Sequence, residues 1–367
     1  EGHAIATGTR AVSVFVVNRR RLVADEIKDL SFAFQVELEV SSETPFIPRL
    51  DLAGLRSEDL DDRIADLQYR DETEFAVGHG AAAEPEVVGG ICRTLRTVWV
   101  PVAGVERVVP SKRDGVELRM EVLAELSDFE AVQAKLGGLV ALYRHWIQEQ
   151  VENALKDVKA VPRRVQTAQE LKKRAIEAAK RIERGIQSLE DPEALDAFRT
   201  ANKVMAAYVR RRKVNEGAKP EDVTPTWFPF QIAFVLLNLE GIVHPAGRDG
   251  RPNDREIVDL LFFPTGGGKT EAYLGLAAIT LLLRRLRNPG LSGAGVAVLM
   301  RYTLRLLTLD QLGRAASVIC ALELERAKHP EKWGTWPFEI GLWVGQGATP
   351  NILGGKGNRK EHTAVWK

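Results

Sequence analysis

A glycine-rich segment in the last third of the chain has the residue types of a phosphate-binding loop. Residues 264–270 read Pro-Thr-Gly-Gly-Gly-Lys-Thr and follow the apolar run 258–263 directly. Adjacent glycines let backbone N–H groups converge on an anion, because no Cβ stands in the way. Lys269 can place a point charge on the outer phosphates of a nucleotide, and Thr270 can offer its hydroxyl to Mg²⁺. The segment therefore predicts a site for a nucleoside triphosphate and Mg²⁺.

The elements expected around this loop fit the same chemistry, that of a P-loop NTPase. A strand at 258–263 would lead into the loop, and an apolar helix would begin near Thr270 with its N-terminal dipole directed at the phosphates. Consecutive residues would surround the phosphates: Thr265, Gly266, Gly267, Gly268, Lys269, Thr270 and Glu271. Lys269 and Thr270 are the candidate catalytic residues, and Thr270 is the candidate magnesium ligand.

An aromatic segment upstream of the loop offers a place for the base. Gln231 lies 38 residues before Lys269 and ends the run 227–231, which reads Trp-Phe-Pro-Phe-Gln. A glutamine amide has a donor and an acceptor that match the N6 amino group and N7 of adenine. Trp227 or Phe230 could stack on the ring. Such a segment suits an adenine base; the alternative is a helix start with a core aromatic residue.

Downstream of the loop, a second group of residues could contact nucleic acid. The expected strand 296–300 is followed by Arg301, Thr303 and Arg305. Cations and a hydroxyl at the start of a helix suit binding to backbone phosphates without base recognition. These three residues are the candidate DNA contacts. The alternative is that they lie on an ordinary exposed helical face.

Three domains are expected to position these residues. Residues 1–125 form a β-rich domain with strands at 12–17, 32–40, 97–102 and 116–122, and residues 126–214 form a helical domain. Residues 215–367 form an incomplete first RecA-like ATPase lobe. In that α/β lobe, strands at 258–263, 296–300 and 338–344 make a parallel sheet with helices on both faces, including helices at 270–287 and 304–328.

Charge and composition exclude several classes. The formal net charge is +1, so no overall field attracts the chain to nucleic acid or to a membrane. Locally, residues 41–90 hold 12 acids and 4 arginines, whereas residues 151–213 hold 16 basic and 9 acidic residues. The basic stretch ends in 210–213 and is a further candidate for tracking phosphates, with a solvated helical face as the alternative. No apolar run is long enough for a membrane span, and the two cysteines are far apart. A cytoplasmic protein is expected.

The order of these segments resembles superfamily 2 helicases and translocases. The loop at 264–270 is similar to their motif I, the run 227–231 to their Q-motif, and the segment after strand 296–300 to their motif Ia. Their adenine-reading glutamine and DNA-contacting strand end would here be Gln231 and the residues from Arg301 onward.

Longer blocks resemble the DrmA family in particular, the helicase-like component of the bacterial DISARM anti-phage system. These blocks are 260–275 (Leu-Leu-Phe-Phe-Pro-Thr-Gly-Gly-Gly-Lys-Thr-Glu-Ala-Tyr-Leu-Gly), 295–308 (Gly-Val-Ala-Val-Leu-Met-Arg-Tyr-Thr-Leu-Arg-Leu-Leu-Thr) and 340–345 (Ile-Gly-Leu-Trp-Val-Gly). The resemblance implies an ATP-dependent DNA helicase or translocase that engages invading DNA without sequence preference. It also implies a DrmB-like partner protein.

One departure from the superfamily limits this interpretation. No Asp-Glu pair of motif II follows residue 270. Without those acids Mg²⁺ lacks a carboxylate contact and the attacking water lacks a base, so we expect this segment alone to be inactive in hydrolysis. A nucleotide kinase or an AAA-type ATPase fits less well, because a kinase has no use for the glutamine segment. The alternative from another class is a non-catalytic ATP-binding scaffold lobe of a defence or restriction complex.

Overall fold

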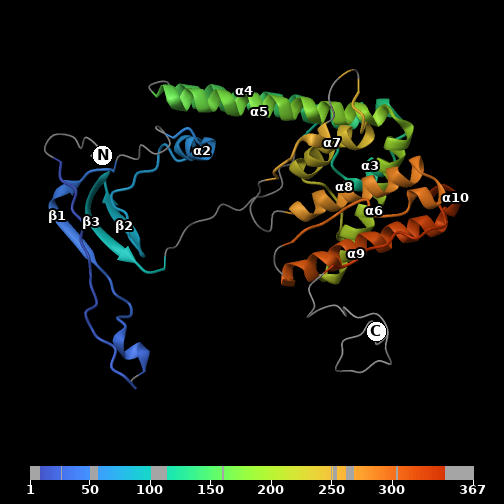
Figure 1. Ribbon diagram of the computed structural model, residues 1–367. Helices are drawn as coiled ribbons and strands as arrows, with labels where there is room; N and C mark the ends of the chain where they lie inside the picture. The colour runs from blue at the N-terminus through green and yellow to red at the C-terminus, as the bar shows by residue number, and fades with distance from the viewer. Residues whose placement is uncertain are drawn as a thin grey trace. The chain divides into compact units, whose positions relative to one another are not determined.

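The computed structural model describes residues 9–25, 27–49, 57–100, 114–158, 161–248, 250, 254–261, 268–302 and 305–343, with elements labelled as in Figure 1. The chain divides into two compact units. Unit 1 comprises residues 1–107 and 159–167, and unit 2 comprises residues 108–158 and 168–367.

Unit 1 contains a small antiparallel sheet. Its strands are β1 (Glu39–Phe46), β2 (Ala82–Val88) and β3 (Ile91–Val98), in the order β1-β3-β2. The hairpin between β2 and β3 turns at Gly89 and Gly90, whose φ angles of 60° and 80° suit a two-residue turn that matches strand twist. The strands therefore form a short meander with β3 in the centre.

A short helix in unit 1 lies within the acidic stretch 41–90. Helix α2 (Leu60–Gln68) begins after Asp59, whose side chain accepts a hydrogen bond from the Asp61 N–H at 2.8 Å. On its other side, Asp66 accepts two hydrogen bonds of 2.9 Å from the guanidinium of Arg164. A bidentate pair of this kind fixes orientation as well as distance. Unit 1 also contains the 3-10 turn η1 (Lys28–Ser31) and the first residues of helix α5.

Unit 2 is built from helices. They are α3 (Met120–Ala124), α4 (Phe129–Val158), α5 (Pro162–Gln187, in unit 2 from residue 168), α6 (Pro192–Asn215), α7 (Pro229–Val243), α8 (Lys269–Arg287), α9 (Arg305–Lys328) and α10 (Pro330–Trp333). Short 3-10 turns connect them: η2 (Ser188–Glu190), η3 (Pro220–Asp222), η4 (Asp254–Glu256) and η5 (Gly290–Gly293). The helices expected at 270–287 and 304–328 correspond to α8 and α9.

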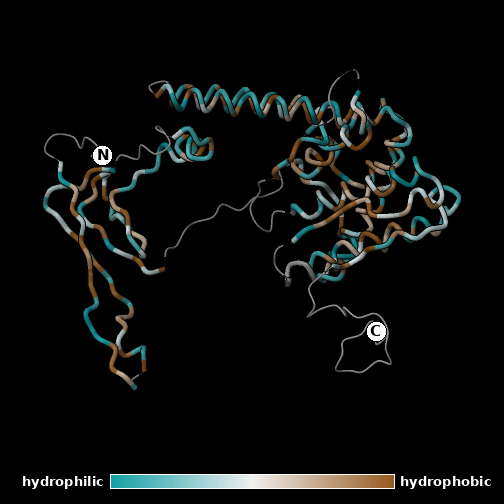
Figure 2. The backbone as a smooth tube through the Cα atoms, viewed as in Figure 1, coloured by the Kyte–Doolittle hydropathy of each residue, from teal (hydrophilic) through white to brown (hydrophobic). Residues whose placement is uncertain are grey.

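Helix α6 lies at the centre of the unit 2 core. Asp191 caps its first turn by accepting hydrogen bonds from the Glu193 and Ala194 N–H groups at 2.9 and 3.0 Å. The helix packs against α3, α8 and α9 and buries Phe198 and Met205 completely. Burying each of these side chains contributes roughly 1.5–3 kcal/mol. Figure 2 shows the apolar segments of unit 2 gathered between the helices.

The prediction of a RecA-like lobe with a parallel sheet is wrong. Within the ranges that the structure describes, the three antiparallel strands of unit 1 are the only sheet. Residues 258–261, 296–300 and 338–343 pair with no neighbouring strand, and Val258 and Val296 are 94% and 83% exposed. A strand needs a partner at about 4.8 Å to satisfy its backbone groups. An apolar run indicates burial but does not specify that partner.

Expected strands in the N-terminal part also need correction. Residues 12–17 form no strand, and Phe15 is 76% exposed, because alternation produces a half-buried strand only where another element covers one face. Of the segments expected at 32–40 and 97–102, only the ends at β1 and β3 are strands among the described residues. Arg119, inside the expected strand 116–122, makes an isolated bridge to Thr226, and helix α3 follows at once.

Candidate nucleotide-binding site

The start of helix α8 carries the described part of the phosphate-binding loop. Gly268 precedes the helix with φ 87°, a left-handed conformation that side chains disfavour. A Cβ at this position would also lie 2.8 Å from Nε2 of Gln231. Lys269 and Thr270 form the first turn of the helix, as expected from the sequence. Thr265, Gly266 and Gly267 lie outside the described residues, so their predicted phosphate contacts stay predictions.

Gln231 connects helix α7 to the loop. Its side chain is buried; Oε1 accepts a hydrogen bond from the Phe228 N–H at 2.8 Å, and Nε2 donates to the Gly268 carbonyl at 2.7 Å. The first bond closes the N-terminal turn of α7 and the second holds the last residue of the loop. The amide therefore positions Gly268 in this structure, and its reading of adenine stays a prediction.

The aromatic residues of the same segment divide into core and surface. Trp227 is 3% exposed, and its Nε1–H donates to Oδ1 of Asn202 on α6 at 2.8 Å. Its ring lies against Gly275, where a Cβ would be 2.6 Å from Cη2. Phe228 and Phe230 are half-buried, with ring centroids 6.1 Å apart. Of the aromatic residues in this segment, Phe228 lines the hollow beside the loop, and the sequence alone did not single it out.

This hollow, of about 800 Å³, is large enough for a nucleotide. Its walls come from the end of α6, the segment before α7, the start of α8 and α9. The residues used below are Arg212, Gln231, Lys269, Thr270, Glu271 and Arg314. Mg²⁺ usually binds phosphates, water and one or two protein oxygens, and the Thr270 hydroxyl fits that role.

Glu271 joins two arginines beside the loop. It is 5% exposed, and its Oε1 accepts hydrogen bonds from Arg212 on α6 and Arg314 on α9. Arg314 also donates to the Tyr208 hydroxyl at 3.3 Å, and the Arg212 guanidinium lies 5.8 Å from the centre of the Tyr208 ring. Burial lowers the pKa of each arginine, but the charge of Glu271 and the contact with Tyr208 outweigh it and raise the pKa of both. Arg212 and Arg314 therefore stay cationic.

Two arginines of α5 hold the chain that leads into the loop. Arg181 is buried and donates to both carboxylate oxygens of Asp259 at 2.6 and 2.8 Å, and to Asp254 at 3.0 Å. Arg184 bonds to Asp254 at 3.1 Å and to Glu240 on α7. These ion pairs hold residues 254–259 in place. They occupy Arg181 and Arg184, which belong to the basic stretch 151–213, a sequence-based candidate for binding nucleic-acid phosphates.

Comparison with known proteins gives one relative. No family model matches the chain. Over 365 residues the chain is 34% identical to the DISARM protein DrmA of Bacillus paralicheniformis, in a match that covers 93% of this chain. The resemblance to DrmA is confirmed. The chain spans 31% of the length of that DrmA, so the activity and partners of a whole DrmA are matters for proposal.

The candidate DNA contacts are only partly described. Arg301 is exposed at the end of segment 296–300. Arg305 is the first residue of α9, but its side chain lies outside the described part, as does all of Thr303. The joint DNA contact of the three residues therefore stays a prediction. Arg210, at the end of the basic stretch, forms an ion pair with Glu121 at 2.5 Å.

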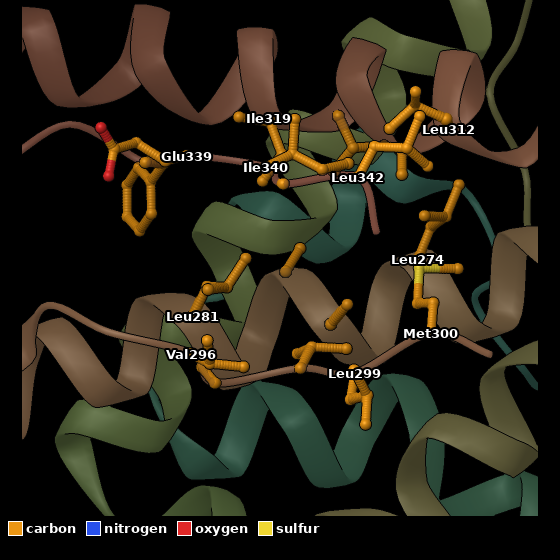
Figure 3. Close-up of a pocket in the computed structure, with 18 of the residues that line it drawn as sticks. Leu274, Leu281, Val296, Leu299, Met300, Leu312, Ile319, Glu339, Ile340 and Leu342 are labelled. Carbon is orange, nitrogen blue, oxygen red and sulfur yellow. The ribbon is translucent and has the colours of Figure 1, made fainter. Parts of the chain in front are cut away.

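A second hollow is larger and mostly apolar. It measures about 1390 Å³ and lies between the extended segments 296–300 and 338–343, over helices α8 and α9 (Figure 3). Leu274 and Leu281 of α8 form part of one wall, and Ile319 of α9 forms part of another. Its apolar lining does not suit phosphates. It occupies the place where the expected sheet would have joined these segments.

The described ranges contain neither a membrane-spanning helix nor a metal-binding cluster. None of the helices there is long and apolar enough to cross a lipid bilayer. In the same part of the chain, no group of three or more His, Cys, Asp or Glu residues has a geometry suited to a metal ion.

Proposed function

We propose that the hollow at the start of α8 binds ATP with Mg²⁺. The observation that supports this most directly is the convergence of Lys269, Thr270 and the Gln231–Gly268 contact on one hollow with further cations. The helix dipole and the backbone N–H groups of the first turn favour an anion there. ATP rather than another triphosphate follows from the resemblance to superfamily 2 helicases.

The wider role that we propose is that of a helicase-like ATPase in bacterial anti-phage defence. The name of the relative, a DISARM protein, supports a defence component. In this proposal ATP hydrolysis in the full-length protein drives engagement of invading DNA, whose backbone contacts Arg301, Thr303 and Arg305. A DrmB-like protein is the proposed partner.

Substitution of the loop lysine tests nucleotide binding. In the full-length protein, Lys269→Ala should weaken ATP binding by roughly 10- to 100-fold, because a charged hydrogen bond contributes about 1.5–3 kcal/mol. The measurement is equilibrium binding of ATP with Mg²⁺. Lys173→Ala, which removes an exposed lysine of α5, is the control and should bind as wild type does. Equal ATP affinity in Lys269→Ala and wild type would reject the site.

One observation favours the alternative, a non-catalytic scaffold lobe. Of the carboxylates that line the hollow in the described chain, Asp222 and Glu271, the latter is engaged by two arginines. Because Glu271 is committed to these ion pairs, it is not available as the base that activates water. Turnover distinguishes the two functions. If the full-length protein binds ATP but does not hydrolyse it with any DNA added, the scaffold function is established.

A further inference from the structure

Three helices place charged side chains at one end of the nucleotide hollow. Arg212 comes from the last turn of α6, Glu271 from the first turn of α8 and Arg314 from α9. A buried carboxylate must be paired, and one guanidinium would be enough to neutralise it. Here two guanidinium groups share a single oxygen of Glu271. The cluster by itself therefore carries an excess positive charge.

The rest of the hollow keeps that excess. Its lining includes four cationic side chains, Arg212, Lys213, Lys269 and Arg314, against the carboxylates of Asp222 and Glu271. Glu216, outside the lining, pairs with Arg212 and Lys213. Each guanidinium has five N–H donors in a planar fork that fits phosphate oxygens, and the shared oxygen of Glu271 occupies few of them. Nε of Arg212 is buried without a hydrogen-bond acceptor, although a Glu216 oxygen lies 3.4 Å away. Donors and charge are available for an anion.

We infer that Arg212 and Arg314 form a clamp on the phosphates of the nucleotide, and that Glu271 is a positioning residue that holds both arginines ready for it. The inference rests on the proposed ATP site and extends it to α6 and α9. Phosphate oxygens would take bidentate hydrogen bonds from the two forks while Lys269 contacts the same anion from α8. The binding of ATP then joins three helices through one ligand.

Two arginine substitutions test the clamp in the full-length protein. Arg212→Ala and Arg314→Ala should each weaken ATP binding about 10-fold or more and leave adenosine binding unchanged, since adenosine has no phosphate. The matched controls are Arg199→Ala on α6 and Arg326→Ala on α9, whose arginines lie outside the hollow lining. Wild-type ATP affinity in both clamp variants, or equal loss of adenosine and ATP, would overturn the inference.

Glu271→Gln provides a readout that a purely structural role would not produce. Without its carboxylate the two arginines repel each other and lose the group that positions them. The melting temperature without nucleotide should therefore fall, and ATP should raise it by less than it raises that of wild type. A structural role alone predicts the same fall with and without ATP, and that result would also overturn the clamp. If wild type itself fails to bind ATP, the proposed function fails; if only Lys269→Ala loses binding, the clamp alone fails.

Discussion

At the scale of single residues, Gln231 carries the most specific geometry in the site. Both polar atoms of its amide are bonded to the backbone, one at the start of α7 and one at Gly268. The structure therefore assigns it a contact that the sequence did not anticipate, since the expected role was to read adenine. These two roles make different predictions for substitution.

Gln231→Ala should weaken ATP and GTP binding alike. The substitution leaves the Gly268 carbonyl and the Phe228 N–H without their partner, which costs roughly 1–3 kcal/mol and loosens the loop that both nucleotides would use. Competition binding of ATP against GTP measures the effect. A loss confined to ATP would instead support direct recognition of the adenine edge.

Which site residues the sequence could predict depends on how far apart they are in the chain. Lys269 and Thr270 lie beside their glycines, so a local pattern identifies them. Arg212 and Arg314 are 59 and 43 residues from Glu271. Arg314 belongs to no local pattern, and Arg212 lies in the basic run 210–213, which the sequence offered only for nucleic-acid phosphates. Only the packing of α6 and α9 against α8 brings them to the loop.

At the scale of elements, helices were predictable and strands were not. A helix makes its backbone hydrogen bonds within itself, so the sequences of α8 and α9 were enough to predict both helices. A strand depends on a partner, so the apolar runs at 258–263 and 296–300 indicated strands that the described chain does not form. The same difference explains residues 116–122, where one isolated bridge leads into α3.

The contact between α8 and the segment before α7 gives a test at this scale. Gly275→Ala should destabilise the protein by roughly 1–3 kcal/mol, because the new Cβ would lie 2.6 Å from the buried ring of Trp227. The measurement is thermal unfolding of the full-length protein. The control is Gly313→Ala on α9, where a Cβ would have nothing within 4 Å and should leave stability unchanged or raise it by up to about 1 kcal/mol. Equal melting temperatures for Gly275→Ala and wild type would show that the ring can move aside.

At the scale of the whole molecule, oppositely charged side chains form ion pairs within each unit. In unit 1, Arg164 pairs with Asp66, and in unit 2, Arg181 and Arg184 pair with acids around the chain that leads to the loop. Much of the basic stretch at 151–213 is thereby committed to structure. Contact with DNA should then depend mainly on the residues that follow segment 296–300.

Salt dependence distinguishes these two sources of charge. Replacing Arg301 and Arg305 together by Ala should flatten the log–log dependence of DNA affinity on salt by about one to two units on every sequence, because each phosphate contact releases counterions. Titrations on unrelated DNA sequences at several salt concentrations measure it. The matched comparison removes two exposed charges from α5 by Lys173→Ala and Arg174→Ala. If only the α5 variant changes the slope, DNA binds along the helical stretch instead.

The apolar hollow in Figure 3 affects the solubility of this chain. Val296 and Leu299 beside it are 83% and 80% exposed, and Trp343 is 99% exposed. Contiguous apolar surface attracts other molecules, and only net charge opposes that attraction at long range. With a formal charge of +1 at pH 7, repulsion between copies is almost nil. Solubility should therefore improve as the pH falls below 7, because the chain gains net positive charge and its copies repel one another more strongly.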